Sequence, residues 1–241
     1  MIEYIGLHFL ERHEWENLQR GCVVTINMQH LYEAYLKPSI REAIFQNPLA
    51  RYTIDGRGAA KLFARHYGVQ SVLEPGNEMV RILLQASGPE DRILIIGSTE
   101  AVVESLRYKF PALLLDHCGD RIPLEETHAA VRRAEALRSR YSLNYRRVFI
   151  ALGTPKGECL GRSLAPLFEC PVYCIGGSFE IITEFLPRAH PGLQKAGLEG
   201  VWRFITQPSL MRLKRVLLSY FFFTLMYFSP AAFFRSLGKR L

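Results

Sequence analysis

The sequence lacks the features that mark several common classes of protein. Its five cysteines form no C-x-x-C pair, which argues against a disulfide framework or a zinc site and favours reduced, cytoplasmic thiols. No basic segment opens the amino terminus, so we expect no signal peptide. Internal repeats, low-complexity segments, a P-loop and a G-x-G-x-x-G fingerprint are also missing. With 49% apolar residues among 241, the chain predicts a packed core for one substantial domain and an appendage.

Acidic residues are missing from residues 200–241, which contain seven basic residues. The whole chain has 30 basic and 23 acidic residues, a net charge of +7, so residues 1–199 hold 23 of each and sum to zero. A nucleic-acid-binding protein more often spreads its basic residues over a binding face, and we therefore expect no nucleic acid partner. The cations of the tail instead flank the stretch "VLLSYFFFTLMYFSPAAFF".

This stretch, residues 216–234, is apolar apart from Ser219, Thr224, Ser229 and Pro230. A membrane-spanning helix needs about 20 apolar residues, and the Ser-Pro pair should break or kink a helix. We expect two shorter elements at a membrane surface, with aromatic rings at the acyl–headgroup boundary and cations against anionic lipid. Packing against the body or a second subunit, or a true span, remain open.

The body of the chain alternates apolar, β-branched runs with helical patterns. This order predicts a mostly parallel sheet with helices on both faces, because parallel strands are buried on both sides. The expected strands are residues 22–26, 51–54, 92–97, 112–116, 147–153 and 171–177. The expected helices are residues 28–37, 58–67, 77–87, 99–109, 125–140 and 157–168.

Three strand ends are rich in glycine or in helix-capping residues: "IIGSTEA", "ALGTPKGE" and "CIGGSFE". Ligands of such folds bind at the carboxyl ends of the strands, often where a helix N-terminus meets a phosphate. Each loop also has a simpler explanation, because Ser98 or Thr99 can cap the following helix with Glu100 in its first turn.

The stretch "TIDGRG", residues 53–58, places an acid between an apolar run and a helical pattern. One interpretation is that Asp55 caps the helix at 58–67, which stabilises a helix by about 1 kcal/mol. The other is that Asp55 takes a proton from a bound molecule, with the glycines at 56 and 58 giving it room. The residues alone leave both interpretations open.

Five blocks in collinear order resemble the WecG/TagA/CpsF family of glycosyltransferases, from about residue 22 to 215. "VVTINMQHL" is similar to the family's "VVTPNxxHL", and "TIDGRGAAKLFARHYG" to its "DGxGVVxxARxxG". "RILIIGSTEAVVESLRYKFPAL" and "VFIALGTPKGE" resemble "VFLLGGxPGVAExAAxxLxxxYPGL" and "LLVGLGxPKQE". The fifth block runs from "CIGGSFEII" through "RAHPGLQKAGLEGVWRFITQPSLMRLKR".

The resemblance implies a bacterial, inverting glycosyltransferase of the hexosyl or N-acetylhexosaminyl type. Its co-substrate would be a UDP-sugar and its acceptor a polyprenyl-diphosphate-linked saccharide in cell-envelope or exopolysaccharide biosynthesis, with neither metal nor other cofactor. We accordingly expect a Rossmann-like glycosyltransferase body, residues 1–196, and a basic, aromatic-rich helical appendage for membrane docking, residues 197–241. The protein would be peripheral or monotopic at the cytoplasmic face of the inner membrane, with homo-oligomers possible.

The resemblance also assigns roles to residues. The family's proposed general base aligns with Asp55, which would accept the proton of the acceptor hydroxyl as that oxygen attacks the anomeric carbon. The residues expected to bind substrate are Thr25, Asn27, Gly56, Gly97, Gly153, Lys156, Glu158, Gly176, Gly177 and Arg188. The expected contacts with lipid are Arg203, Arg212, Lys214 and Arg215. His30, His117 and His190 show no ligand spacing and are interpreted as structural.

Some blocks depart from the family pattern. Gly157 stands where the family has a Gln, and Leu73 where an Arg is usual. These changes fit either a different donor or acceptor, or a catalytically silent member that binds nucleotide-sugar or scaffolds a polysaccharide assembly complex. A soluble α/β ligand-binding domain whose aromatic tail is an oligomer interface is a further alternative.

Overall fold

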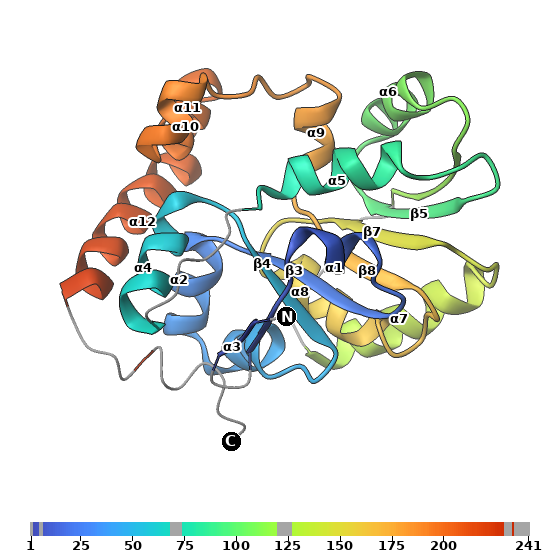
Figure 1. Cartoon of the computed structure of the whole chain (residues 1–241), viewed down its shortest axis with the longest axis horizontal. Helices are drawn as coiled ribbons and strands as arrows, with labels where there is room; N and C mark the ends of the chain where they lie inside the picture. Colours follow the sequence, from blue (N-terminus) through green and yellow to red (C-terminus); the bar gives the residue numbers. More distant parts are fainter. Residues whose placement is uncertain (1, 5–6, 68–73, 120–126, 229–232, 234–241) are drawn as a thin grey trace.

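The described residues form one eight-stranded sheet with helices on both faces (Figure 1). The structure is a computed structural model and describes residues 2–4, 7–67, 74–119, 127–228 and 233. The strand order is β1-β2-β4-β3-β8-β7-β5-β6, in which β1 is antiparallel to β2 and the other seven strands are parallel. The strands are β1 (Ile2–Tyr4), β2 (Leu7–Phe9), β3 (Gly21–Ile26), β4 (Ala50–Ile54), β5 (Arg92–Gly97), β6 (Leu114–Cys118), β7 (Arg147–Ala151) and β8 (Pro171–Cys174).

Helices connect the strands and end the chain. The helices of the body are α1 (Arg12–Glu16), α2 (Met28–Leu36), α3 (Pro38–Phe45), α4 (Arg57–Tyr67), α5 (Gly76–Gln85), α6 (Glu100–Lys109), α7 (Thr127–Arg140), α8 (Lys156–Leu164) and α9 (Ser178–Ile182). The last three helices are α10 (Pro191–Ala196), α11 (Glu199–Thr206) and α12 (Leu210–Phe228).

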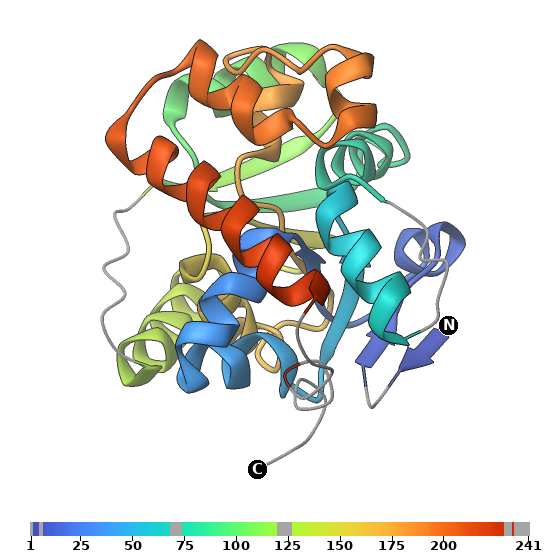
Figure 2. The same cartoon turned by 90° about the vertical axis from the view of Figure 1, so that its left-hand side faces the viewer.

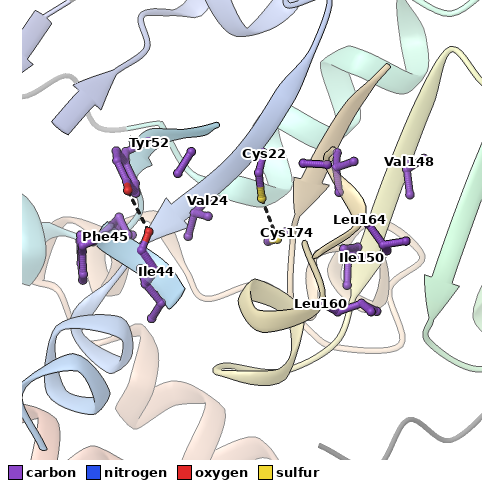
Figure 3. Close-up of a cluster of buried hydrophobic side chains, with 14 of the residues drawn as sticks. Cys22, Val24, Ile44, Phe45, Tyr52, Val148, Ile150, Leu160, Leu164 and Cys174 are labelled. Carbon is purple, nitrogen blue, oxygen red and sulfur yellow. Dashed lines mark hydrogen bonds between the residues drawn. The ribbon is translucent and has the colours of Figure 1, made fainter. Parts of the chain in front are cut away.

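The two faces of the sheet carry separate apolar cores, as expected for buried parallel strands. Every residue of β3, β7 and β8 is buried. Val24 and Ile150 point into the cluster beneath α2, α3, α4, α7 and α8, part of which Figure 3 shows. Their neighbours Val23 and Phe149 point into the cluster beneath α1, α5, α6 and α9. The prediction of a parallel sheet covered on both faces is therefore confirmed.

Helix α8 approaches the sheet closely at Gly161. A Cβ atom there would lie 2.6 Å from the Cys174 sulfur and 2.9 Å from the Cys22 sulfur, so only glycine fits. These two thiols are buried and 3.8 Å apart (Figure 3). All five cysteines are free, in agreement with the reading of reduced thiols.

Several boundaries differ from the sequence-based expectation. The strand expected at 112–116 is β6, two residues later, because a turn in which the Leu113 N–H donates to the Phe110 carbonyl uses the start of the apolar run. The strands expected at 147–153 and 171–177 end at Ala151 and Cys174, because their glycine-rich ends leave the sheet as loops. The short strands β1 and β2 and the helices α1, α3, α9 and α10 were not predicted.

One face of α12 packs on the body. Figure 2 shows α12 crossing the surface formed by α2 and α4. Phe222 and Met226 are 2% and 3% exposed and belong to the core cluster beneath α2 and α4. Arg65 Nε donates to the Tyr227 carbonyl at 2.8 Å, and His66 Nε2 donates to the Met226 carbonyl at 2.8 Å. For this face of α12, the alternative that the apolar tail packs against the body is therefore confirmed.

A second face of α12 is apolar and exposed. Its row of exposed side chains, the apolar row, is Leu217, Phe221, Leu225 and Phe228. No helix in the described part of the chain is long and apolar enough to cross a bilayer. The break expected at Ser229-Pro230 lies outside the described residues, so the prediction of two short elements stays a prediction.

Candidate active site

The predicted binding loops lie together because the strands that precede them are parallel. Neighbouring strands β4, β3, β8, β7 and β5 all end at the same edge of the sheet. The loops that follow them begin at Asp55, Asn27, Ile175, Leu152 and Ser98. Strand β3 pairs with β4, the next strand in the chain, on one side and with β8, the last strand, on the other. Folds of this kind bind ligands at this edge.

Asp55 directly follows β4, and its backbone is fixed to the neighbouring strand. Its N–H donates to the Ile26 carbonyl at 2.7 Å. Helix α4 begins at Arg57, and the Ala60 N–H bonds to the Gly56 carbonyl, so Gly56 occupies the N-cap position. The interpretation of Asp55 as the helix cap is therefore wrong. Gly56 has a φ of 88°, a left-handed conformation that turns the chain between strand and helix.

The Asp55 carboxyl lies in a recess. The residue is partly accessible, yet enough protein surrounds it that burial raises its pKa to about 6. The negative charge of Glu199 raises the pKa further, while the positive charges of Arg203 and His30 oppose the rise. A carboxyl with this pKa is suited to proton transfer near neutral pH.

Two of these neighbours belong to α11. Glu199 was missed in the sequence because it resembles an ordinary acid in the first turn of a helix. Arg203 was assigned to lipid, but its charge acts on Asp55; its contact with lipid stays a prediction. Of the other basic residues assigned to lipid, Lys214 and Arg215 are exposed, and Arg212 donates to the Gln207 carbonyl at 2.6 Å.

Asn27 and Thr25 have structural partners at the end of β3. Asn27 caps α2, since its Oδ1 accepts the N–H groups of Gln29 at 2.9 Å and His30 at 3.4 Å. Thr25 is buried, and its hydroxyl donates to the Cys174 carbonyl at 3.4 Å. These contacts give both residues a structural role in the fold. Their contact with substrate stays a prediction.

A buried polar group lies between the first turns of α2 and α8. His30 Nε2 is 2.9 Å from Glu158 Oε1 and 3.1 Å from the Thr154 hydroxyl. Both His30 and Glu158 are 3% exposed. The Glu158 carboxylate, predicted to contact substrate, is therefore turned toward His30. Its second oxygen, Oε2, is buried without a hydrogen-bond partner among the described residues.

The glycines of the predicted loops differ in the space around them. A Cβ atom at Gly56, Gly153 or Gly176 would meet nothing within 4 Å, so the backbone there faces open space. A Cβ atom at Gly97 would lie 2.8 Å from the Ala151 carbonyl oxygen, so packing alone requires glycine there. At Gly177 it would lie 3.6 Å from Glu180 Oε2. The first three glycines leave space for a ligand to approach.

Ser98, Thr99 and Glu180 define the loop after β5. Thr99 caps α6, as its simpler explanation predicted, by accepting the Val102 N–H at 3.4 Å. The Ser98 hydroxyl donates to Glu180 Oε1 at 3.2 Å, which ties this loop to α9 beside β8.

The remaining predicted residues are basic or depart from the family pattern. Lys156, the first residue of α8, and Arg188 are exposed. A hydrogen bond from Arg81, with help from the charge of Arg188, lowers the pKa of Glu78. Gly157 is buried against the Leu152 carbonyl. Leu73 lies outside the described residues.

A family model, described as the glycosyl transferase WecG/TagA/CpsF family, matches residues 7–235, nearly the whole chain. The chain belongs to this family. The WecG/TagA/CpsF membership makes the protein a glycosyltransferase of cell-surface polysaccharide synthesis, which uses a nucleotide-sugar donor and a lipid-linked acceptor. The resemblance read from the five blocks is thus confirmed.

The WecG/TagA/CpsF match covers both the sheet that carries Asp55 and the helices α10, α11 and α12. The sheet and the final helices are therefore both part of the region that the family shares. Helix α11 contributes two charged residues, Glu199 and Arg203, to the surroundings of Asp55.

Proposed function

We propose that the protein transfers a hexosyl or N-acetylhexosaminyl group, with inversion, from a UDP-sugar to a polyprenyl-diphosphate-linked saccharide. Asp55 is the general base. The observation that carries the proposal is the recessed carboxyl of Asp55 at the ligand-binding edge, with a pKa raised to about 6. Such a group is mostly ionised at pH 7 and still accepts a proton effectively in the transition state.

The reaction is a single displacement. The acceptor hydroxyl oxygen bonds to the anomeric carbon, its proton passes to a carboxylate oxygen of Asp55, and the bond between the anomeric carbon and the UDP oxygen breaks. UDP leaves with the bonding electron pair. Backbone N–H groups at the open glycines Gly153 and Gly176, and the N-terminus of α8 with Lys156, supply positive potential for the diphosphate.

Release of UDP tests this proposal. A panel of UDP-sugars is offered with a polyprenyl-diphosphate-linked saccharide to the wild type and to Asp55→Asn. We expect release that depends on acceptor and falls at least about a hundredfold in the variant, since a general base contributes about 10²–10⁴-fold. Equal release by both proteins contradicts the role of Asp55. Binding of UDP without release from any donor favours the silent binding protein, which the glycine at 157 first suggested.

We further propose that the apolar row of α12 docks the protein on the cytoplasmic face of the bacterial inner membrane. Phe221 is 68% exposed at the centre of the row, and the exposed cations Lys214 and Arg215 lie on the same helix. Apolar side chains with neighbouring cations suit the acyl–headgroup boundary of an anionic bilayer.

Deletion of the tail is a poor test of docking, because Phe222 and Met226 are part of the core. The paired substitution Phe221→Ser and Leu225→Ser changes only the exposed row. We expect at least about tenfold weaker binding to vesicles that contain anionic lipid, with an unchanged melting temperature. Tyr108→Ser, at an 87% exposed position of α6, is the matched control. Binding that drops equally in the control, or in neither variant, contradicts docking through α12.

A further inference from the structure

A groove between α4 and α12 takes no part in the chemistry proposed above. Its volume is about 590 Å³, and its lining residues are Lys61, Ala64 and Arg65 of α4 and Phe223 and Tyr227 of α12. The two helices lie side by side on the surface of the molecule (Figure 2). The hydrogen bond from Arg65 Nε to the Tyr227 carbonyl, 2.8 Å long, joins the two walls.

The wall formed by α12 is aromatic. Phe223 and Tyr227 are partly buried, and their ring centroids are 5.6 Å apart. With about 3.6 residues per turn, these two rings lie between the buried face of α12, which carries Phe222 and Met226, and the apolar row. The groove therefore borders the row of side chains that we propose to face the membrane.

The wall formed by α4 is cationic. Lys61 and Arg65 are exposed and lie one helical turn apart. Lys61 has no hydrogen bond or ion pair within the described part of the chain. The Arg65 guanidinium lies 4.7 Å from the centre of the Tyr227 ring, and only its Nε is bonded to a described residue. Neither α4 nor α12 contains an acidic residue, so the groove attracts anions.

Aromatic rings beside unpaired cations suit an amphiphile with an anionic head. The rings pack against hydrocarbon, and the cations bind phosphate oxygens. An isoprenyl diphosphate has both parts, whereas a nucleotide-sugar has the charge without the hydrocarbon.

The position of the groove relative to Asp55 fits such a ligand. Helix α4 begins at Arg57, two residues after Asp55. Lys61 and Arg65 follow Arg57 by about one and two turns, or about 6 and 12 Å along the helix axis. A saccharide whose hydroxyl lies at Asp55 therefore has room to place its diphosphate beside Lys61.

We propose that this groove binds the diphosphate and the first isoprenyl units of the lipid-linked acceptor. Lys61 and Arg65 bind phosphate oxygens, Phe223 and Tyr227 pack against the isoprenyl chain, and the rest of the chain passes beside the apolar row into the membrane. The inference rests on the proposed function, in which Asp55 accepts the proton of the acceptor hydroxyl.

The test is isothermal titration calorimetry of the full-length protein with farnesyl diphosphate, a short isoprenyl diphosphate. We expect it to bind at least about tenfold more tightly than inorganic diphosphate, which offers the aromatic wall no hydrocarbon. Inorganic diphosphate that binds equally tightly overturns the isoprenyl part of the proposal.

Two variants change the two walls separately. Lys61→Gln removes a cation and should weaken binding of farnesyl diphosphate at least about fivefold, because hydrogen bonds between charged groups are strong. Ala64→Phe fills the groove at constant charge, so it should weaken farnesyl diphosphate by a similar factor and leave inorganic diphosphate unchanged. Unchanged melting temperatures show that both variants fold.

Lys109→Gln is the matched control. Lys109 also lies on a helix, α6, but on the other face of the sheet, where it pairs with Glu184. Its loss removes the same charge and should leave the affinity unchanged. Full affinity in both Lys61→Gln and Ala64→Phe, or an equal loss in Lys109→Gln, overturns the proposal.

Vesicle binding distinguishes the acceptor from membrane phospholipid. If Lys61→Gln binds farnesyl diphosphate normally but binds vesicles of anionic phospholipid more weakly, the groove holds a phospholipid headgroup and the proposal is wrong. In the transfer assay, Lys61→Gln should raise the KM for the acceptor at least about fivefold and leave the KM for the UDP-sugar unchanged. A rise in the KM for the UDP-sugar alone also overturns the proposal.

Failure of the proposed function looks different. Asp55→Asn then retains UDP release, whereas its binding of farnesyl diphosphate, measured by calorimetry, reports on the groove alone. Because the Asp55 carboxyl does not bind the diphosphate, this variant should bind farnesyl diphosphate as the wild type does.

Discussion

Asp55 lies just before α4 and Glu158 in the first turn of α8, and the structure gives these two acids opposite surroundings. Asp55 is partly accessible, and burial raises the pKa of its carboxyl to about 6. Glu158 is 3% exposed and holds His30 at 2.9 Å. In the function that we propose, the first acid exchanges a proton with a bound acceptor, whereas the second holds His30 in place. Both acids lie at the start of a helix, so this position does not distinguish their roles. The residues that surround each carboxyl do.

The largest expected effect comes from removing Glu158, the buried acid of this comparison. Glu158→Ala leaves His30 without its anionic partner in the interior, and we expect the free energy of unfolding to fall by about 3–5 kcal/mol. Urea denaturation measures the loss. Glu42→Ala removes an exposed partner of α8 and should cost about 0–1 kcal/mol. A loss below about 1 kcal/mol for Glu158→Ala contradicts a holding role.

A smaller effect, of opposite sign, is expected at Asp55. Its pKa is about 6 in the folded protein against 3.8 in the reference state, so the folded state binds the proton more tightly. The free energy of unfolding therefore falls as the pH rises through this window. Asp55→Asn lacks this fall and should be more stable than the wild type at pH 8, by about 1–3 kcal/mol.

Urea denaturation at pH 8 and pH 4.5 checks this expectation. The advantage of Asp55→Asn should shrink strongly at pH 4.5, where the folded wild type is protonated. A difference that is equal at both pH values means that the Asp55 carboxyl is not the titrating group.

The smallest expected effect tests whether the charges that face Asp55 set the pKa of its carboxyl. Glu199→Gln removes a negative charge that raises the pKa of Asp55. The acid limb of kcat/KM for UDP release should then move to lower pH by about half a unit. Glu184→Gln, which removes an exposed acid paired with Lys109, is the control and should not move it. A limb that moves upward in Glu199→Gln excludes Glu199 as a neighbour of the base.

The sheet and most helices were predictable because their signals are local. Continuous apolar runs such as 92–97 identify buried parallel strands, and β5 matches its predicted bounds. The start of β6 was misplaced, since apolar residues that follow Phe110 serve a turn before they serve the strand. The strands β1 and β2, three residues each, are too short for a periodic pattern.

The candidate site was predictable only where a residue follows a strand. Asp55 and the open glycines were found by that rule. Sequence order places His30 and Glu158 128 residues apart, and nothing local indicates that the third residues of two helices meet. Glu199 was missed for a similar reason, because its influence on Asp55 arises from the return of α11 to the edge of the sheet.

The hydrogen bonds from Arg65 and His66 attach the end of helix α4 to the end of α12. The eleven residues of α4 form a rod about 16 Å long, with the proposed base just ahead of one end and the last turn of α12 held at the other. The Asp55 loop and the last turn of α12 are therefore joined through one short, continuous helix.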